Sequence, residues 1–349
     1  MKQMNEIEHR FPYRWTLKDA VFTKDKGKVF SCFACGGGST MGYKLAGFDV
    51  LGCNEIDPKM IEAYKANHNP KYAYLEPIQT FKLREDLPQE LYELDILDGS
   101  PPCSSFSMAG NREKDWGKDK VFREGQAMQV LDTLFFDFID LAKKLQPKVV
   151  VAENVKGLLM GEAIAYVREI YKQFDEARYY CQHWLLDASK MGVPQRRERV
   201  FFIALRKDLA APFLIQQDMF TQVPELKLDF NEAEIDLESL DIELKGKHFV
   251  SAGNERHIKF GRLRYGNSNE VAFTLTATGN QVDYFDKIEN ESFVNGKKFN
   301  NEQVNLIATF PTDYNFNRKR NIYMCGMSVP PVMTAQIATE IYNQWLSKI

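Results

Sequence analysis

Apolar runs of strand length that alternate with helical stretches are the feature that most limits which folds this chain can adopt. Pro147–Ala152 contains a continuous apolar run after Lys148, which is typical of a strand buried on both faces of a parallel sheet. Strands that alternate with helices indicate βαβ units, so we predict an α/β fold with a doubly wound, Rossmann-like sheet. A helix is expected over Val130–Leu145, and further strands at Lys28–Ala34, Phe48–Cys53, Leu91–Leu97 and Val200–Leu205.

The alternation of strands and helices stops near residue 207, which predicts a change of domain. Residues 207–297 hold an acidic stretch and then short alternating segments such as Glu270–Thr278, as in a smaller, mostly β or irregular domain. We expect four parts: an N-terminal arm over 1–27, a catalytic and cofactor-binding domain over 28–206, the smaller domain over 207–297, and a C-terminal segment over 298–349 that returns to the catalytic domain.

Composition and charge are ordinary for a globular protein. The 349 residues are 44% hydrophobic and carry a formal net charge of −3, which gives no general signal for nucleic-acid binding. No apolar stretch reaches the ~18–20 residues of a membrane span, and the N-terminus lacks the apolar core of a signal peptide, so a cytoplasmic location is expected. Cys32 and Cys35 form a C-x-x-C without a second such pair, so no metal site is predicted.

Chemically useful side chains follow the ends of the predicted strands, where ligands bind in doubly wound sheets. The loop Phe33-Ala34-Cys35-Gly36-Gly37 allows close backbone approach but lacks the spacing of a triphosphate-binding loop. Glu55 ends the next predicted strand, where a carboxylate can accept hydrogen bonds from ribose hydroxyls. The loop and this acid together indicate an adenosine-containing cofactor, although the loop alone is equally consistent with a simple tight turn.

Cys103 follows Pro101-Pro102 at the end of a predicted strand, so its side chain is held in a fixed direction. A lone cysteine is usually an inert buried residue, but a thiolate is also a strong nucleophile. Glu153 ends another strand and is either a helix cap or a substrate ligand. Arg197 and Arg199 precede the strand at Val200, and strand alternation would point both side chains to one face. They form either a solvated basic turn or a pair of donors to a base carbonyl or phosphate.

Eight motifs in this order resemble the DNA cytosine-5 methyltransferase family of bacterial or phage type. Pro-Pro-Cys, Glu-Asn-Val and Gln-Arg-Arg-Glu-Arg are the most specific of them, and the resemblance covers most of the chain. The motifs are Phe33–Gly38, Asn54–Asp57, Pro101–Cys103, Glu153–Val155, Gln195–Arg199, Thr274–Thr276, Phe310–Tyr314 and Gly326–Val329.

The resemblance implies methyl transfer from S-adenosylmethionine to C5 of a cytosine flipped out of duplex DNA. Cys103 would attack C6 of the base, Glu153 would engage N3 and the exocyclic amine, and Arg199, supported by Arg197, would hold O2. Residues 104–125 would close over the DNA, and 207–297 would be the target-recognition domain. S-adenosylmethionine contacts are implied for Phe33, Ala34, Cys35, Gly36, Gly37, Glu55, Ile56, Ile78, Pro102 and Ser328, and DNA contacts for Ser105, Ser107, Arg196, Thr274 and Thr276.

The chain departs from the family pattern at four positions. Cys35 stands where Gly is usual in the cofactor loop, and Ser104 replaces the Gln that usually follows the nucleophile. Pro77 occupies the usual position of an Asp near the adenine, and Met327 replaces an Asn near the cofactor.

Three other functions fit some of these residues. A tRNA cytosine-5 methyltransferase shares the motifs, but the Cys-Phe-Thr tripeptide typical of that branch is absent. A catalytically idle DNA-binding regulator on the same fold would not need Cys103, Glu153 and Arg199. An NAD-type oxidoreductase would explain the glycine loop alone. We expect duplex DNA as the partner, a monomer without membrane contact, and a cognate restriction endonuclease, if present, that acts separately.

Overall fold

The computed structural model describes two compact units, which are treated separately. The sheet unit comprises residues 22–186, 198–228 and 337–349, and the second unit comprises 1–21, 187–197 and 229–336. The described residues are 9–102, 119–120, 129–130, 133–161, 163–218, 221–242, 248–251, 264–277, 282–285, 287–289, 292–294, 297–317 and 321–349.

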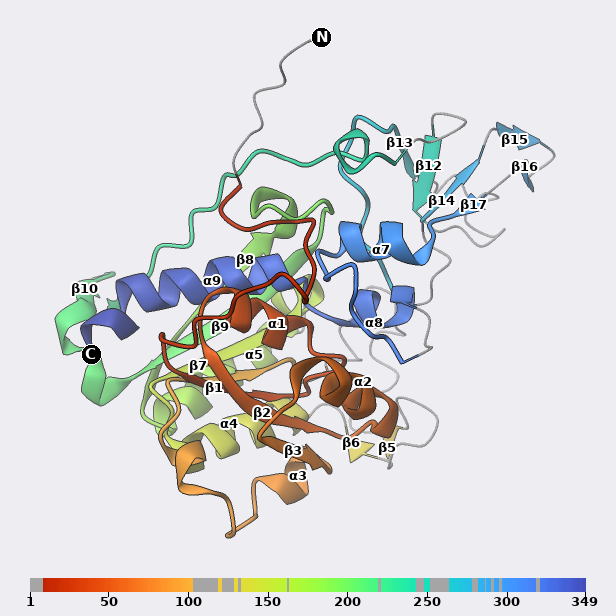
Figure 1. Ribbon diagram of the computed structural model, residues 1–349. Helices are drawn as coiled ribbons and strands as arrows, with labels where there is room; N and C mark the ends of the chain where they lie inside the picture. The colour runs from red at the N-terminus through yellow and green to blue at the C-terminus, as the bar shows by residue number, and fades with distance from the viewer. Residues whose placement is uncertain are drawn as a thin grey trace. The chain divides into compact units, whose positions relative to one another are not determined.

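The sheet unit is built on seven strands in the order β3-β2-β1-β4-β7-β9-β8 (Figure 1). The pairs β1–β2, β1–β4, β2–β3 and β4–β7 are parallel, whereas β7–β9 is antiparallel. This arrangement confirms the predicted α/β, Rossmann-like fold. The strands are β1 Lys28–Cys32, β2 Asp49–Glu55, β3 Tyr72–Leu75, β4 Ile96–Gly99, β7 Val149–Val155, β8 Tyr179–Asp187 and β9 Glu198–Arg206.

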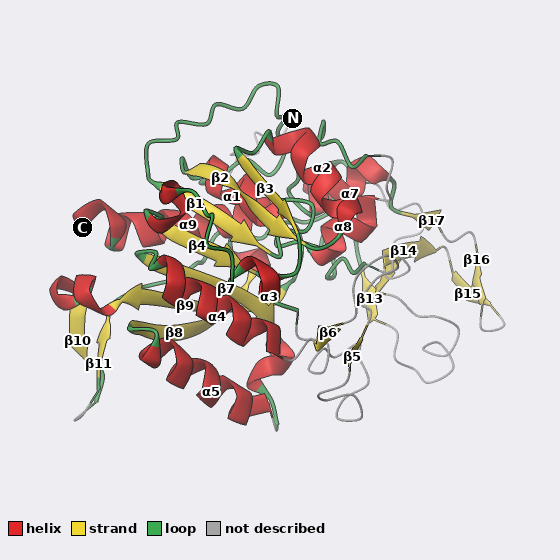
Figure 2. Ribbon diagram, turned by 90° about the horizontal axis from the view of Figure 1, so that it is seen from below, coloured by secondary structure: helices red, strands yellow, loops and turns green. Residues whose placement is uncertain are grey.

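Helices cover both faces of this sheet: α4 and α5 lie on one face and α1 on the other (Figure 2). Helix α4 (Leu134–Leu145) buries an apolar stripe that includes Phe135, Phe138 and Ile139, as an amphipathic helix requires. This stripe packs with residues of α5 (Ala163–Glu176) and of the strands in one continuous core. The other helices of this unit are α1 Gly38–Leu45, α2 Pro58–His68 and α3 Ile78–Phe81; α9, Pro331–Gln344, runs into its last segment.

Two predicted boundaries were wrong. The strand expected over Leu91–Leu97 starts only at Ile96, because Pro88 begins a 3-10 helix over Gln89–Tyr92 that buries Leu91. The helix expected from Val130 starts at Leu134, after a short strand at Gln129–Val130. In both places apolar residues continue across a change of backbone conformation, so their pattern does not mark the boundary.

The second unit joins three distant parts of the sequence. The Trp15 indole N–H donates to the carbonyl of Thr309 at 3.1 Å, and the Asp313 carboxylate accepts the backbone N–H groups of Leu17 (2.6 Å) and Lys18 (3.1 Å). Residues 9–21 of the predicted N-terminal arm are therefore attached to the Phe310–Tyr314 motif. Helix α7 (Asn301–Ile307) begins with a capping box made by Asn300 and Gln303, and α8 spans Asn321–Met327.

Short strands and 3-10 helices complete the described structure. A four-stranded sheet has the order β13-β12-β14-β17, and β5–β6, β10–β11 and β15–β16 form two-stranded pairs. No helix among the described residues is both long enough and apolar enough to cross a membrane. The short strands are β5 Asp119–Lys120, β6 Gln129–Val130, β10 Leu214–Gln216, β11 Gln222–Pro224, β12 His248–Ser251, β13 Arg264–Gly266, β14 Val282–Phe285, β15 Lys287–Glu289, β16 Ser292–Val294 and β17 Lys297–Lys298.

Gly99 ends β4 against the ring of Phe138 on α4. A Cβ at Gly99 would lie 2.6 Å from a ring carbon of Phe138, which is completely buried. We predict that Gly99→Ala lowers the free energy of unfolding by about 1–3 kcal/mol through overpacking, as measured by urea denaturation. The double variant Gly99→Ala/Phe138→Leu should recover part of this loss, and strictly additive effects would contradict the steric explanation.

Candidate active site

The loop between β1 and α1 reverses direction through an unusual backbone. Phe33 and Cys35 adopt positive φ angles of 52° and 50°, and Gly37 has φ 92°. Cys35 therefore holds a left-handed conformation that favours glycine, which explains why glycine suits this position. Its thiol packs 3.6 Å from the Met60 sulfur. The predicted cofactor residues Phe33, Ala34, Cys35, Gly36 and Gly37 all belong to this loop, which we call the cofactor loop.

Glu55, at the end of β2, holds the cofactor loop through its carboxylate. Oε2 accepts the backbone N–H of Cys35 at 2.7 Å, and Oε1 accepts those of Ile56 and Asp57, both at 2.9 Å. Glu55 is buried, and α2 begins directly after it because Asp57 caps that helix and Pro58 occupies its first turn. The parallel pairing of β1 with β2 thus places the acid beside the loop, as predicted.

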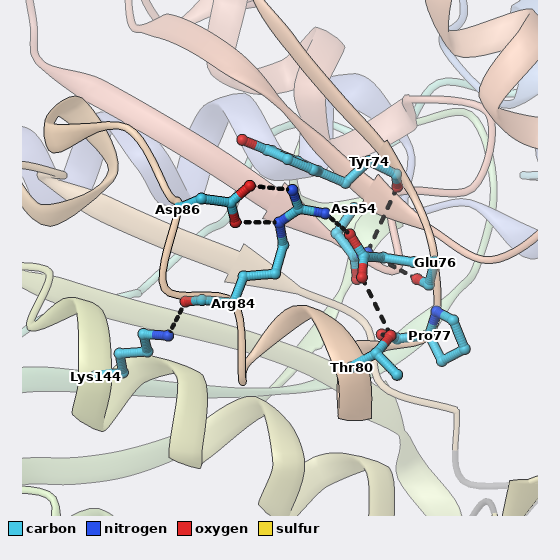
Figure 3. A network of polar contacts seen from close by, with 8 residues as sticks. All are labelled: Asn54, Tyr74, Glu76, Pro77, Thr80, Arg84, Asp86 and Lys144. Atoms are coloured by element: carbon cyan, nitrogen blue, oxygen red, sulfur yellow. Dashed lines mark hydrogen bonds and ion pairs between the residues drawn. The ribbon is translucent and has the colours of Figure 1, made fainter.

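Ile78 begins α3. The two residues before it, Glu76 and Pro77, are held by hydrogen bonds from β2 and from residues within and after α3. Asn54 donates to the carbonyl of Glu76 at 2.8 Å, and the Glu76 carboxylate accepts from Arg84 (3.0 Å) and Thr80 (3.2 Å) (Figure 3). The Pro77 carbonyl accepts the N–H groups that start α3. Pro77 itself offers no side-chain acceptor here, so backbone and apolar groups shape this end of β3.

Glu153 and Arg199 come together from neighbouring antiparallel strands. In β7–β9, Val155 pairs with Arg199, and Arg199 Nε lies 2.9 Å from Glu153 Oε1. The two side chains are only 13% and 17% exposed. A second donor, Arg199 Nη1, is 2.8 Å from the carbonyl of Glu198. A charge pair so well shielded can present a carboxylate and a guanidinium side by side to one polar ring.

Asn154, the residue after Glu153 on β7, holds the segment that leads to Cys103. Its amide donates to the carbonyl of Pro101 at 3.2 Å, and its Oδ1 accepts the N–H of Val155 at 2.8 Å. Asn154 belongs to the predicted Glu-Asn-Val motif, but no role was predicted for its side chain. A polar residue at the end of an apolar strand is the sequence signal that could have indicated one. Pro102 is described, whereas Cys103, Ser105, Ser107 and, apart from β5, the segment 104–125 lie outside the described residues.

Arg197 belongs to the second unit and binds backbone carbonyls. It is only 2% exposed, and its guanidinium donates to the carbonyls of Leu275 (3.0 Å), Gly326 (3.0 Å) and Ser328 (2.9 Å). The prediction that strand alternation aligns Arg197 with Arg199 does not describe this arrangement, because β9 starts only at Glu198. Arg197 instead ties together two other predicted motifs.

Gln195 and Thr274 complete this junction. Gln195 is fully buried; its Oε1 accepts the N–H of Leu275 at 3.0 Å and its Nε2 donates to the carbonyl of Ile307 at 3.1 Å. The Thr274 hydroxyl donates to the carbonyl of Arg196 at 2.5 Å. A Cβ at Gly326 would lie 2.3 Å from the carbonyl carbon of Thr276, so α8 packs directly on this backbone. The Arg196 side chain is 49% exposed, with its guanidinium 3.8 Å from Glu234.

Ser328 follows α8 and carries a buried hydroxyl. The residue is 4% exposed, and its Oγ makes no hydrogen bond with the described residues. A buried hydroxyl without a partner is costly, and it can be satisfied by a bound polar ligand. Within the sheet unit, the left-handed glycine loop and the Glu55 carboxylate offer backbone and acceptor groups that fit a nucleoside cofactor with hydroxyl groups.

Comparisons with known proteins match most of the chain to one family. The family model for C-5 cytosine-specific DNA methylases matches residues 27–343. The Type II methyltransferase M.FnuDI of Fusobacterium nucleatum is 30% identical over 341 residues, covering 90% of this chain and 94% of that protein. The Type II methyltransferase M.NgoPII of Neisseria gonorrhoeae is 29% identical over 340 residues, with 90% and 95% covered.

Solved structures show the same fold. A mutant of DNMT2 from Spodoptera frugiperda has a TM-score of 0.61 at 20% identity, covering 90% of this chain and 99% of that one. A prophage-encoded DNA modification methyltransferase (E. coli) has a TM-score of 0.59 at 18% identity, covering 91% and 99%.

Arg197 should be sensitive even to replacement by lysine. A lysine ammonium is a point charge and cannot reach three carbonyls in the geometry of a guanidinium. We predict that Arg197→Lys lowers the free energy of unfolding by about 3 kcal/mol, because two charged hydrogen bonds are lost. The matched variant Arg14→Lys, at a pair with Asp241 that is half exposed, should cost under about 1 kcal/mol. Equal losses for both variants in urea denaturation would contradict this assignment.

Proposed function

Because the chain belongs to the C-5 cytosine-specific DNA methylase family and is a DNA cytosine-5 methyltransferase, we propose that it transfers a methyl group from S-adenosylmethionine to a flipped-out cytosine. The target lies in a specific duplex DNA sequence. The observation that carries this proposal is the shielded Glu153–Arg199 pair, together with the adjacent Asn154, which holds the segment that leads to Cys103.

Cys103 makes the poorly nucleophilic C5 of cytosine reactive. Its thiolate forms a bond to C6, and the displaced electron pair makes C5 a carbon nucleophile. C5 then takes the methyl group and loses its proton, and the C6–sulfur bond breaks to restore the aromatic ring. The base must leave the DNA stack for this chemistry, because stacking hides C6 from attack.

Glu153 and Arg199 stabilise the ring while it carries extra charge. The Glu153 carboxyl hydrogen bonds to N3 and to the exocyclic amine, and the Arg199 guanidinium donates to O2. Without DNA the two side chains neutralise each other at 2.9 Å. An entering base replaces part of this ion pair with contacts of the same polarity, so neither charge is left buried without a partner.

S-adenosylmethionine supplies the methyl group when it is bound. The cofactor loop would surround it with backbone, and Glu55 would accept hydrogen bonds from its ribose hydroxyls. Ile56, Ile78 and Pro102 would contribute apolar and backbone contacts, and the Ser328 hydroxyl would gain a partner. Pro77 has no carboxylate, so this chain would hold the adenine without a charged acceptor at that position.

The remaining assignments concern DNA. Arg196, Thr274 and Thr276 would contact DNA from the second unit, and Ser105 and Ser107 from the segment after Cys103; residues 207–297 would read the target sequence. The enzyme would act as a monomer in the cytoplasm, and a cognate restriction endonuclease, where one exists, would act separately. The description of the matching family model, C-5 cytosine-specific DNA methylase, favours DNA over tRNA as the substrate.

The covalent step can be tested by trapping. We predict that duplex DNA with 5-fluorocytosine at the target forms an adduct that survives denaturing electrophoresis and requires S-adenosylmethionine, because fluorine cannot leave as the proton does. Cys103→Ala should abolish the adduct, whereas Cys181→Ala, in β8, should retain it. Preferred trapping of tRNA would support the tRNA alternative, and no adduct on DNA known to contain the site would contradict the mechanism.

Glu153 should act mainly on the rate of reaction. We predict that Glu153→Gln lowers single-turnover methylation by about 10²–10³-fold, because a neutral amide cannot supply the same proton and charge. Affinity for duplex DNA, measured by anisotropy, should change by less than about 10-fold because phosphate contacts dominate it. Glu169→Gln, at an exposed glutamate on α5, is the control and should leave the rate unchanged. An unchanged rate for Glu153→Gln would exclude the assigned role.

A further inference from the structure

Asp98 is a buried carboxylate to which the mechanism above gives no task. It lies in β4, five residues before Cys103 in the sequence, and is 4% exposed. Its Oδ2 accepts from the hydroxyls of Ser31 (2.7 Å) and Ser39 (2.8 Å), and its Oδ1 accepts from the hydroxyl of Tyr43 (3.2 Å). The three donors are themselves buried. All three converge on one side chain, so this is a specific polar junction within the apolar sheet unit.

The donors lie on both sides of the cofactor loop. Ser31 is in β1, directly opposite Asp98 in the parallel ladder, and precedes the loop. Ser39 and Tyr43 are in α1, which follows the loop. The carboxylate of Asp98 therefore holds both ends of the loop from the β4 side, while Glu55 holds Cys35 from the β2 side.

The same residue also belongs to the segment that carries the nucleophile. Gly99 follows it against the Phe138 ring, and Pro101 is held by Asn154. The contacts at Asp98, Gly99 and Pro101 thus restrain the segment that leads to Pro102. Hydrogen bonds and a close-packed ring connect the cofactor loop to this segment through Asp98.

We propose that Asp98 is a positioning residue that fixes the cofactor loop to the segment bearing Cys103, so that cofactor binding and cysteine attack depend on one buried carboxylate. The inference rests on the proposed function. A carboxylate suits this task because it offers two acceptor oxygens to three hydroxyl donors, whereas an asparagine amide offers one oxygen and adds donors of its own.

Stability alone does not account for a charge at this position. Burial, with a smaller contribution from the charge of Glu153 on β7, raises the pKa of Asp98 from 3.8 to about 6, although its three hydrogen bonds oppose this. The other titratable groups that face it are Cys32 on β1 and Tyr43 on α1. Because the folded-state pKa is raised, the stabilisation present below about pH 4 is lost as pH rises through about 6. Ionised Asp98 therefore disfavours the folded state at neutral pH.

The test compares Asp98→Asn with the wild type by titration calorimetry with S-adenosylmethionine, by the rate of adduct formation at saturating cofactor, and by melting temperature. We expect about 10-fold weaker binding and slower adduct formation at pH 7.5, without a lower melting temperature. Wild-type affinity should fall as pH drops through about 6, and Asp98→Asn should lack this change.

Two further variants keep the test decisive if Asp98→Asn folds poorly. Ser39→Ala removes one donor without changing charge and should weaken cofactor binding. Tyr179→Phe removes a buried hydroxyl that bonds to Pro147 and should change neither binding nor adduct rate.

Four outcomes distinguish this inference from the proposed function. Binding and adduct rate that both fall in Asp98→Asn, or in Ser39→Ala if only that variant folds, support the coupling. A change in only one of the two, or in neither, overturns it. A fall in melting temperature with an unchanged pH profile would indicate a merely structural residue. Wild-type protein that binds no S-adenosylmethionine would overturn the proposed function and this inference together.

Discussion

The parallel pairing of β1 with β2 on one side and β4 on the other is the constraint on which the rest of the site depends. Parallel strands bring their carboxyl ends to one edge of a sheet, so the loop after β1 is flanked by the ends of both neighbours. Each neighbour contributes a buried carboxylate, Glu55 from β2 and Asp98 from β4. The backbone of the cofactor loop is thus shaped by its neighbours as much as by its own glycines.

The antiparallel addition of β9 beside β7 is the second determinant. It places Arg199 across from Val155, and the guanidinium reaches Glu153 along the same edge. Reversing the direction of one strand brings a residue from the start of β9 to the end of β7. A purely parallel sheet would have placed the corresponding residue at the opposite edge, far from the nucleophile segment.

The fold class follows from features visible in the sequence: strand-like runs and helical periodicity. The ion pair of Glu153 with Arg199 does not, because it depends on β9 running antiparallel to β7. The partners of Arg197 do not, since its three carbonyls lie far along the chain and backbone acceptors leave no mark in a sequence. The role of Asp98 was equally hidden, because serine and tyrosine hydroxyls at ordinary core positions carry no sign of a shared acceptor. Pro88 shows the opposite case, because the 3-10 helix that follows this proline replaces the first part of the strand predicted over Leu91–Leu97.

The second unit has a consequence for the order of events during synthesis. Trp15 and Thr309, which meet through a hydrogen bond, are 294 residues apart in the sequence. The chain emerges from the ribosome N-terminus first, and the loop-closure entropy of so distant a contact must be offset before it contributes stability. The Trp15 indole therefore cannot form this hydrogen bond until Thr309 has been synthesised. All seven strands of the main sheet have been synthesised by then, so this contact of the second unit forms only after the strands of the sheet unit are available.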